Sequence, residues 1–360
     1  MVGAKAAYAY DKGITGKGVT IAVIDTGIAT SSAEFAGRIS PDSKAFENKI
    51  ARCATCAPET VTFALADVQG HGTEVASVAL AARNGNGMHG VAYDATLLAL
   101  KIAAPDLENV TATSVIKEAD GANPMNIAPA ITYAVEKGAF VISLSLNGEA
   151  GGQAAAEQRA AMDGVVKADR LLVQSVSNFV DDKSANAGTN TRNFVGSNLE
   201  NKDNFLFGIR VDSSLRPPSG NGLPGDLADR TLAVVATDVS VIGKDGQLTT
   251  VTGNSFAAPA IAGAAALLKQ YWPQLSGKAI LAHPARYGDR PRRQGCRPDL
   301  RCWFAQHRGG DEGAGTGQRL CSGRHGAGAL FLAQPVGSVR YWRPVVGCGH
   351  PHDGVRPLWP

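Results

Sequence analysis

The chain has 360 residues, of which 44% are hydrophobic and 19% charged, and its formal net charge is +3. These values fit a soluble globular protein better than a disordered, membrane or nucleic-acid-binding one. No run of about 18 or more apolar residues occurs, and the residues after Met1 lack the apolar core of a signal peptide, so the sequence predicts neither a membrane segment nor an export signal in this chain.

Apolar, β-branched runs alternate with helical patterns through the first 278 residues. Strands are predicted at residues 19–24, 95–102, 139–146, 171–177 and 231–237. Helices are predicted at residues 72–83, 126–137, 154–168 and 256–271. This alternation predicts an α/β fold, a doubly wound and mostly parallel sheet with helices on both faces, whose functional site lies at the carboxyl ends of the strands. The polar stretch 181–226 predicts long loops around one short apolar run at 205–211.

An acidic residue stands at the carboxyl end of the first predicted strand, because Asp25, Thr26 and Gly27 follow it directly. Alone, this pattern is more typical of an aspartate that caps a turn. The same letters open the catalytic loop of aspartic peptidases, whose chemistry needs two carboxylates that share a proton. No second Asp-Thr-Gly or Asp-Ser-Gly occurs in the chain, so the sequence excludes this alternative.

A histidine and a serine follow at the starts of two predicted helices. His71 stands between Gly70 and Gly72 and is a candidate general base; no second histidine comes four residues later, which excludes a helical zinc motif. Ser255 opens the helix at 256–271, whose dipole and free amide groups favour the negative charge that develops when a hydroxyl attacks a carbonyl. By itself, an ordinary serine N-cap has the same appearance.

Together, Asp25, His71 and Ser255 stand in the chain order of subtilisin, whereas an α/β-hydrolase needs the order serine, acid, histidine. The three segments resemble the motifs of the subtilase family over about residues 16–275, with details similar to subtilase domains of bacterial surface or autotransported proteins. The resemblance implies a serine endopeptidase that hydrolyses peptide bonds through an acyl-enzyme, with Ser255 as nucleophile, His71 as base and Asp25 orienting the imidazole. For an ordinary histidine, activity is expected to rise between about pH 6 and 8.

The resemblance also implies an oxyanion donor and a substrate-binding strand. The strand at 171–177 ends at Asn178, which matches the position of the family's oxyanion asparagine, although Ser177 stands where glycine is usual. The segment 143–148 is similar to the strand that lines the family's cleft and pairs with an extended peptide. The candidate substrate-binding residues are therefore Ser143, Ser145, Leu146, Asn147 and Gly148.

The chain departs from the family pattern at three positions near the motifs. Glu74 stands where the family often has a second histidine, Asn254 where threonine is usual and Ala260 where histidine is frequent. None of these departures removes a catalytic atom. A catalytically inactive or truncated subtilase-like protein, which acts at most as a binding module, is the alternative to an enzyme.

The expected partners follow from the same resemblance. It implies a secreted or cell-surface protein that acts on polypeptide substrates without an organic cofactor or a metal in the chemistry. We also expect a monomer, and the composition and charge predict no nucleic-acid partner. A structural calcium ion, which many subtilases bind through scattered carbonyls, has no visible motif here. Cys53 and Cys56 are candidates for a local disulfide, while metal binding and free thiols stay open as alternatives.

The composition changes near Lys278. No lysine occurs after this position, whereas arginine, glycine, proline and tryptophan accumulate and the periodicity is lost. The region also holds four of the six cysteines, which are Cys296, Cys302, Cys321 and Cys348. We therefore expect residues 1–278 to form a subtilisin-like peptidase domain with an incomplete C-terminal part, and residues 279–360 to be an irregular tail that is either frameshifted or disordered.

We expect limited proteolysis to remove residues 279–360 first, because a segment without periodic apolar residues cannot pack against a core. Translation of the coding DNA in the other frames after codon 278 should reveal a helical continuation. A protease-resistant tail with no such continuation in either frame would contradict this interpretation.

Overall fold

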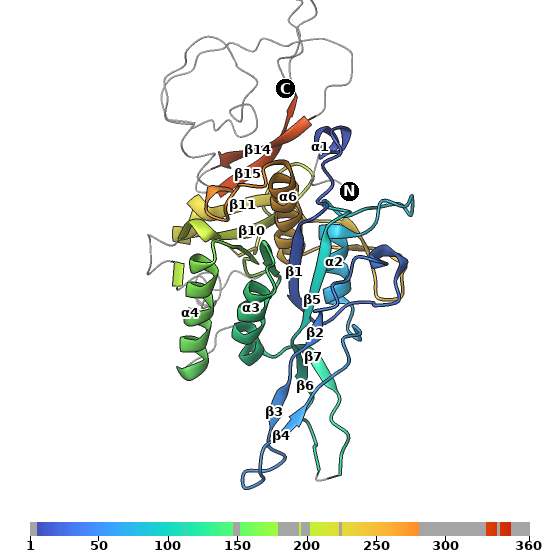
Figure 1. Ribbon diagram of the computed structural model, residues 1–360, viewed down its shortest axis with the longest axis vertical. Coiled ribbons are helices and arrows are strands. Elements are labelled where there is room, and N and C mark those ends of the chain that lie inside the picture. The colour runs from blue at the N-terminus through green and yellow to red at the C-terminus, as the bar shows by residue number, and fades with distance from the viewer. Residues whose placement is uncertain are drawn as a thin grey trace, which may run out of the picture.

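A nine-stranded, mostly parallel β-sheet forms the centre of the computed structural model (Figure 1). The residues that the structure describes are 6–111, 113–146, 152–178, 194–195, 202–222, 225–280, 329–336 and 339–346. The strand order is β14-β15-β11-β10-β9-β8-β1-β5-β2, and only the β14–β15 pair is antiparallel. The strands of this sheet are β1 (Thr20–Asp25), β2 (Lys44–Ala45), β5 (Thr96–Lys101), β8 (Val141–Leu144), β9 (Leu171–Ser175), β10 (Phe205–Val211), β11 (Thr231–Val235), β14 (Ala329–Val336) and β15 (Val339–Val346).

Helices cover both faces of the sheet, which confirms the predicted α/β fold class. The helices α2 (His71–Leu80) and α6 (Ala257–Tyr271) share one buried cluster with Ile21 and Val23 of β1. The helices α3 (Ile127–Glu136) and α4 (Gly152–Lys167) share a second cluster with Ala22 and Ile24. Successive residues of a strand point to opposite faces, so the unbroken apolar run of β1 supplies both cores.

The chain runs from β1 to one side of the sheet through β5 and then returns to β8 on the other side of β1. In open α/β sheets, ligands bind outside the carboxyl ends of the strands where this reversal occurs. Asp25 is the last residue of β1, and Ser145 follows the last residue of β8. The reversal therefore predicts a site between these two residues.

The helix α6 lies unusually close to its neighbours. A Cβ atom built at Gly208 of β10 would lie 2.9 Å from Cβ of Ala257, and one at Gly263 would lie 2.7 Å from Cβ of Val91. The alanine-rich sequence of α6 is needed for this close approach, because larger side chains would push the helix away from the sheet. Close packing also fixes the short 3₁₀ turn η5 (Asn254–Phe256), which precedes α6 and contains Ser255.

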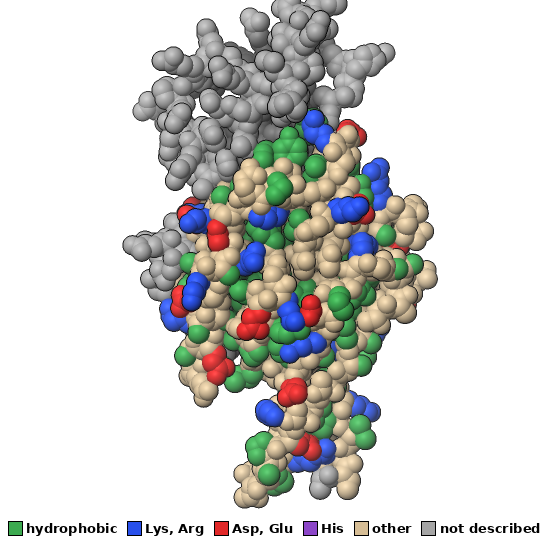
Figure 2. All heavy atoms as spheres, viewed as in Figure 1, with side chains coloured by type: hydrophobic (Ala, Val, Ile, Leu, Met, Phe, Trp, Pro, Cys, Tyr) green, Lys and Arg blue, Asp and Glu red, His purple; other side chains and the backbone are tan. Residues whose placement is uncertain are grey.

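Two hairpins that sequence reasoning did not predict project from the carboxyl edge of the sheet (Figure 1). One consists of β3 (Asn48–Ile50) and β4 (Glu59–Val61), and the other of β6 (Ala103–Pro105) and β7 (Glu118–Ala122). These strands are short and partly exposed, so they lack the apolar runs that identify the central strands. Figure 2 shows the hairpins as a protrusion that carries hydrophobic side chains and charges of both signs.

Arg52 fastens the two hairpins to each other. Its Nη1 atom donates to the carbonyl oxygens of Thr111 at 2.8 Å and Ser114 at 2.7 Å, and its Nε atom pairs with Glu59 at 2.5 Å. We refer to the two hairpins, residues 48–61 and 103–122, as the arm.

The remaining elements connect or extend these layers. A further hairpin of β12 (Val239–Ile242) and β13 (Leu248–Val251) packs on α2, where Ile242 N donates to Ser77 Oγ at 3.1 Å. The other short elements are α1 (Ala7–Asp11), η1 (Ala33–Phe35), η2 (Pro124–Asn126), η3 (Lys202–Asn204) and η4 (Gly225–Arg230). Among the residues that the structure describes, no helix is long and apolar enough to cross a membrane.

The tail contributes a hairpin of β14 and β15, whose second strand pairs with β11. These two strands are the only part of residues 281–360 that the structure describes. The division of the chain at residue 278 and the origin of the tail stay predictions.

We expect Gly208→Val to lower the free energy of unfolding by about 1–3 kcal/mol, because the new side chain would overlap the start of α6. Denaturant unfolding followed by circular dichroism would measure the change. As a control, Gly164→Ala in α4 adds a Cβ with no heavy atom within 4 Å and should stabilise the protein by about 0.5–1 kcal/mol. Equal stability of Gly208→Val and wild type would contradict the close packing of α6.

Candidate active site

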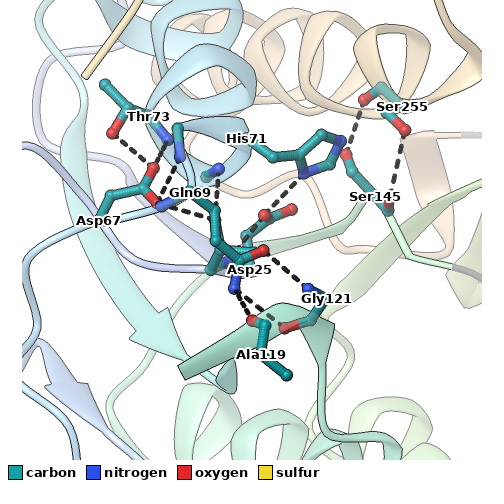
Figure 3. A network of polar contacts seen from close by, with 12 residues as sticks. Asp25, Asp67, Gln69, His71, Thr73, Ala119, Gly121, Ser145 and Ser255 are labelled. Atoms are coloured by element: carbon teal, nitrogen blue, oxygen red, sulfur yellow. Dashed lines mark hydrogen bonds and ion pairs between the residues drawn. The ribbon is translucent and has the colours of Figure 1, made fainter. Parts of the chain in front are cut away.

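Asp25, at the end of β1, and His71, at the start of α2, form a partly buried hydrogen-bonded pair (Figure 3). The Oδ1 atom of Asp25 lies 2.7 Å from Nδ1 of His71 and accepts a second hydrogen bond from the backbone of Thr26 at 2.8 Å. The side chain of Asp25 is 1% exposed, whereas that of His71 is 32% exposed. Since Nδ1 faces a carboxylate, it carries the proton in the neutral ring, and Nε2 is left as the basic nitrogen.

The surroundings of His71 favour its charged form. Burial alone lowers the pKa of the imidazole, but the charge and hydrogen bond of Asp25, together with the carboxylates of Glu74 and Asp67, outweigh burial and raise the pKa to about 9. This pKa lies above the range of about pH 6–8 that an ordinary histidine would suggest. The difference arises from three carboxylates that the fold gathers around one ring.

Asp67 holds the turn that presents His71. Its Oδ1 atom accepts hydrogen bonds from Thr26 Oγ1 at 3.0 Å and from Gly70 N at 2.8 Å, and its Oδ2 atom accepts from Thr73 N at 2.8 Å and Thr73 Oγ1 at 2.7 Å. Burial raises the pKa of this carboxyl, but these hydrogen bonds outweigh burial and lower it. A single carboxylate thus joins the end of β1 to the start of α2. Sequence reasoning missed Asp67, since an aspartate four residues before a histidine carries no distinct pattern.

Two glycines allow the same segments to touch. A Cβ atom at Gly72 would lie 2.3 Å from the carbonyl oxygen of Gly27. Gly27 itself has a φ angle of 125°, which disfavours any other residue. The glycine after His71 is therefore required by a backbone contact between β1 and α2.

Gln69 connects the turn before His71 to the arm. Its Nε2 atom donates to the carbonyl oxygens of Ala119 at 2.8 Å and Gly121 at 3.2 Å, and its Oε1 atom accepts from Gly121 N at 2.8 Å (Figure 3). The side chain thereby binds the backbone of β7 much as a neighbouring strand would. This residue was also missed, because the contact spans an element that the sequence did not predict.

Ser255 lies on the other side of the imidazole, in the turn η5. Its Oγ atom donates to the carbonyl oxygen of Ser145 at 3.4 Å, while Ser145 Oγ donates to the carbonyl oxygen of Ser255 at 2.7 Å (Figure 3). The ring of the next residue, Phe256, has its centroid 6.1 Å from that of the His71 ring. The fold therefore brings Asp25, His71 and Ser255 to one place.

Asn178 lies beside the turn that contains Ser255. Its Oδ1 atom accepts a hydrogen bond of 2.7 Å from the backbone N–H of Asn254. A backbone N–H can only donate, so the partner must be Oδ1, and Nδ2 is the donor end of this amide.

The predicted substrate-binding residues have different surroundings. Ser143 does not fit this role, because it is 1% exposed and lies inside β8, which pairs with β1 on one side and β9 on the other. Ser145 contacts Ser255, and the carbonyl oxygen of Leu146 accepts a hydrogen bond from Gln174 Nε2 at 2.8 Å. Asn147 and Gly148 lie outside the described residues.

The predicted cysteine pair lies in the arm, outside this site. Cys53 and Cys56 are joined by a disulfide with a Cα–Cα distance of 5.0 Å, in the loop that connects β3 and β4. Within the described part of the chain, no group of three or more His, Cys, Asp or Glu residues could hold a metal ion.

A comparison with protein families finds one that covers most of the chain. The model of the Subtilase family matches residues 16–294. The chain belongs to the Subtilase family. This result confirms the resemblance inferred from the three motifs.

Relatives of this subtilase include serine proteases from several bacteria. An extracellular serine protease of Serratia marcescens is 41% identical over 97 residues, which are 27% of this chain but only 8% of that protein. Subtilisin DY of Bacillus licheniformis is 26% identical over 271 residues, covering 75% of this chain and 83% of the relative. The major intracellular serine protease of Bacillus subtilis is 28% identical over 273 residues, covering 74% and 73%. The chain thus spans a small part of the Serratia protease and most of the two Bacillus proteins.

Solved structures show the same fold. A cold adapted subtilisin-like serine proteinase has a TM-score of 0.54 and 18% identity, covering 76% of this chain and 83% of that chain. The S41 psychrophilic protease has a TM-score of 0.54 and 21% identity, covering 76% and 84%. Both confirm the subtilisin-like α/β architecture.

We expect an NMR titration to give His71 a pKa near 9, and Asp25→Asn to return it toward about 6.5, because the amide removes both the charge and the ionic hydrogen bond. His89, whose pKa is lowered mainly by burial, serves as an internal control that should not change.

The same shift has a consequence for stability. The folded pKa of His71 lies above the unfolded value, so its stabilising contribution is present below about pH 6.5 and is lost as the pH rises through about 9. The difference in free energy of unfolding between wild type and Asp25→Asn should therefore shrink over this interval. An unchanged His71 pKa in Asp25→Asn would contradict the pairing.

Proposed function

We propose that this subtilase is a serine endopeptidase in which Asp25, His71 and Ser255 form the catalytic triad. The observation that supports the proposal is the 2.7 Å hydrogen bond between Asp25 and Nδ1 of His71, with Ser255 on the far side of the ring (Figure 3). This arrangement gives Nε2 the role of proton acceptor and leaves the hydroxyl as nucleophile.

The proposed reaction begins when the Ser255 hydroxyl turns from the carbonyl oxygen of Ser145 toward Nε2 of His71. The Oγ atom then bonds to the carbonyl carbon of the substrate as its proton passes to Nε2. Asp25 stabilises the resulting imidazolium, and the negative charge on the substrate oxygen receives a hydrogen bond from Nδ2 of Asn178. The proton returns to the leaving amine as the C–N bond breaks, and a water molecule hydrolyses the acyl-enzyme by the same steps.

The orientation of the Asn178 amide supports its part in this mechanism. Its Oδ1 atom is occupied by Asn254 N at 2.7 Å, so Oδ1 cannot turn toward the oxyanion without losing that hydrogen bond. A fixed amide of this kind costs no reorganisation when charge develops.

Polypeptides are the proposed substrates. Ser145 and Leu146 follow the end of β8 and lie at the carboxyl edge of the sheet, where an extended peptide could pair with backbone groups. We further propose an extracellular location, which the Cys53–Cys56 disulfide favours because such bonds persist in oxidising compartments. The names of the relatives include both extracellular and intracellular proteases.

We also propose that Glu34 takes part in a structural calcium site. Glu34 is 3% exposed. Its Oε1 atom accepts hydrogen bonds from Asn84 at 2.8 Å and Asn86 at 3.1 Å, while Oε2 is buried without a hydrogen-bond partner among the described residues. Carboxylate, amide and carbonyl oxygens are the ligands that calcium prefers. Glu34 with oxygens of the loop at 84–88 would hold the ion, which has no part in the proposed chemistry.

We expect Ser255→Ala to abolish labelling by a fluorophosphonate probe and to reduce casein digestion by several orders of magnitude, because the nucleophile is removed. The exposed Ser214 provides a matched control, since Ser214→Ala should leave both activities unchanged. Labelling of folded Ser255→Ala at the wild-type rate would contradict the proposal. A folded wild-type protein that neither reacts with the probe nor digests casein would support the alternative, an inactive binding module.

A further inference from the structure

The side chain of Asn254 lies in a closed polar network directly behind the proposed nucleophile. Asn254 is 0% exposed. Its Nδ2 atom donates to the carbonyl oxygen of Ser177 at 2.5 Å and to Asn221 Oδ1 at 3.0 Å, and its Oδ1 atom accepts from Arg210 N at 2.7 Å. One amide therefore joins the segment after β9, the strand β10 and the loop at Asn221.

The orientation of this amide is determined by its partners. The carbonyl oxygen of Ser177 can only accept and the backbone N–H of Arg210 can only donate, so Nδ2 and Oδ1 cannot exchange places. The hydroxyl of a threonine, the residue usual at this position of the family, provides a single oxygen on a shorter side chain. It cannot span both partners from the same backbone position.

The network holds two proposed functional residues at once. Asn254 directly precedes Ser255, and Ser177 directly precedes Asn178, so the 2.5 Å hydrogen bond joins the two segments one residue away from each reacting group. The backbone N–H of Asn254 also donates to Asn178 Oδ1 at 2.7 Å. Asn254 is therefore bonded to the segment that carries Asn178 through both its side chain and its backbone.

The carbonyl of Ser177 is also held from a second side. Gly222 N donates to it at 3.2 Å, and a Cβ atom at Gly222 would lie 2.2 Å from the same oxygen. Asn221, which is 2% exposed, is fixed in turn by Arg210 Nε at 3.0 Å. The partners of Asn254 are thus held by hydrogen bonds of their own. The network can therefore hold the turn that contains Ser255 at a defined distance from the segment that carries Asn178.

We propose that Asn254 is a positioning residue whose buried side chain sets the distance between Ser255 Oγ and Asn178 Nδ2. This inference rests on the proposed function, because it assigns Asn254 no contact with the reacting atoms and lets it act only by placing the Asn178 amide relative to Ser255. The oxyanion contact forms mainly in the transition state, so loss of the correct distance lowers kcat and leaves KM nearly unchanged.

The first test compares Asn254→Ser with Asn48→Ser in the full chain, using a short peptide p-nitroanilide as substrate. Asn48 is a matched control, since it is 1% exposed, bonds to Ala103, Asn123 and Asn126, and lies at the root of the arm. Both variants should lose stability, but only Asn254→Ser should lose kcat, by about 10- to 100-fold with KM within about twofold. Wild-type kcat in folded Asn254→Ser would overturn the inference, as would an equal loss of kcat in both variants.

The second test is a double-mutant cycle with Asn178→Ala. If Asn254 acts through Asn178, Asn254→Ser should reduce kcat by no more than about twofold in the Asn178→Ala background, whereas independent effects would multiply and overturn the inference. Asn254→Thr replaces Asn254→Ser if the latter does not fold, and it should show the same loss of kcat. A wild-type kcat in Asn178→Ala would show that Asn178 is not the oxyanion donor and would overturn this inference. An inactive wild-type protein would instead contradict the proposed function.

Discussion

The hydrogen bond between Asp25 and His71 is the interaction on which the rest of the site depends. It requires a carboxylate at the end of a buried central strand and an imidazole at the start of a helix, held 2.7 Å apart. Gly27 and Gly72 allow the backbone after β1 to touch the start of α2. Asp67 accepts five hydrogen bonds from these segments and from the turn between them, including one from Gln69 N. The rigidity of this pair comes from backbone contact and buried polar groups rather than from apolar packing alone.

The other half of the site is built on the opposite side of the strand reversal. The segments after β8 and β9 carry Ser145 and Asn178, while Ser255 comes from the turn before α6. Small residues let α6 approach the sheet closely, as Gly208 and Ala257 illustrate. Five separate stretches of chain therefore supply the proposed functional residues, and each adjoins a strand or helix of the core.

The arm connects to this site through buried polar groups at its root. Gln69, two residues before His71, binds the backbone of β7, and Lys101 pairs with Glu118 at 2.7 Å. Lys101 is 1% exposed and also donates to the carbonyl oxygen of Ala66 at 2.5 Å. The net contribution of a buried ion pair of this kind to stability is small, because desolvation offsets much of the attraction. The arm and the turn before His71 consequently form one continuous piece of structure.

Local patterns in the sequence predicted the fold class and five of the central strands, and they selected Asp25, His71 and Ser255 as the candidate catalytic residues. Apolar periodicity and short motifs extend over a few neighbouring residues, so a single sequence is enough to recognise them. The two hairpins of the arm were not predicted, because short, half-exposed strands show no regular pattern of apolar residues. Only the tertiary structure decided how Asn254 meets Asn178, a contact between residues 76 positions apart, and how a pKa near 9 arises from carboxylates brought together around one ring. Distances between segments depend on how the layers pack, and no local pattern in the chain encodes them.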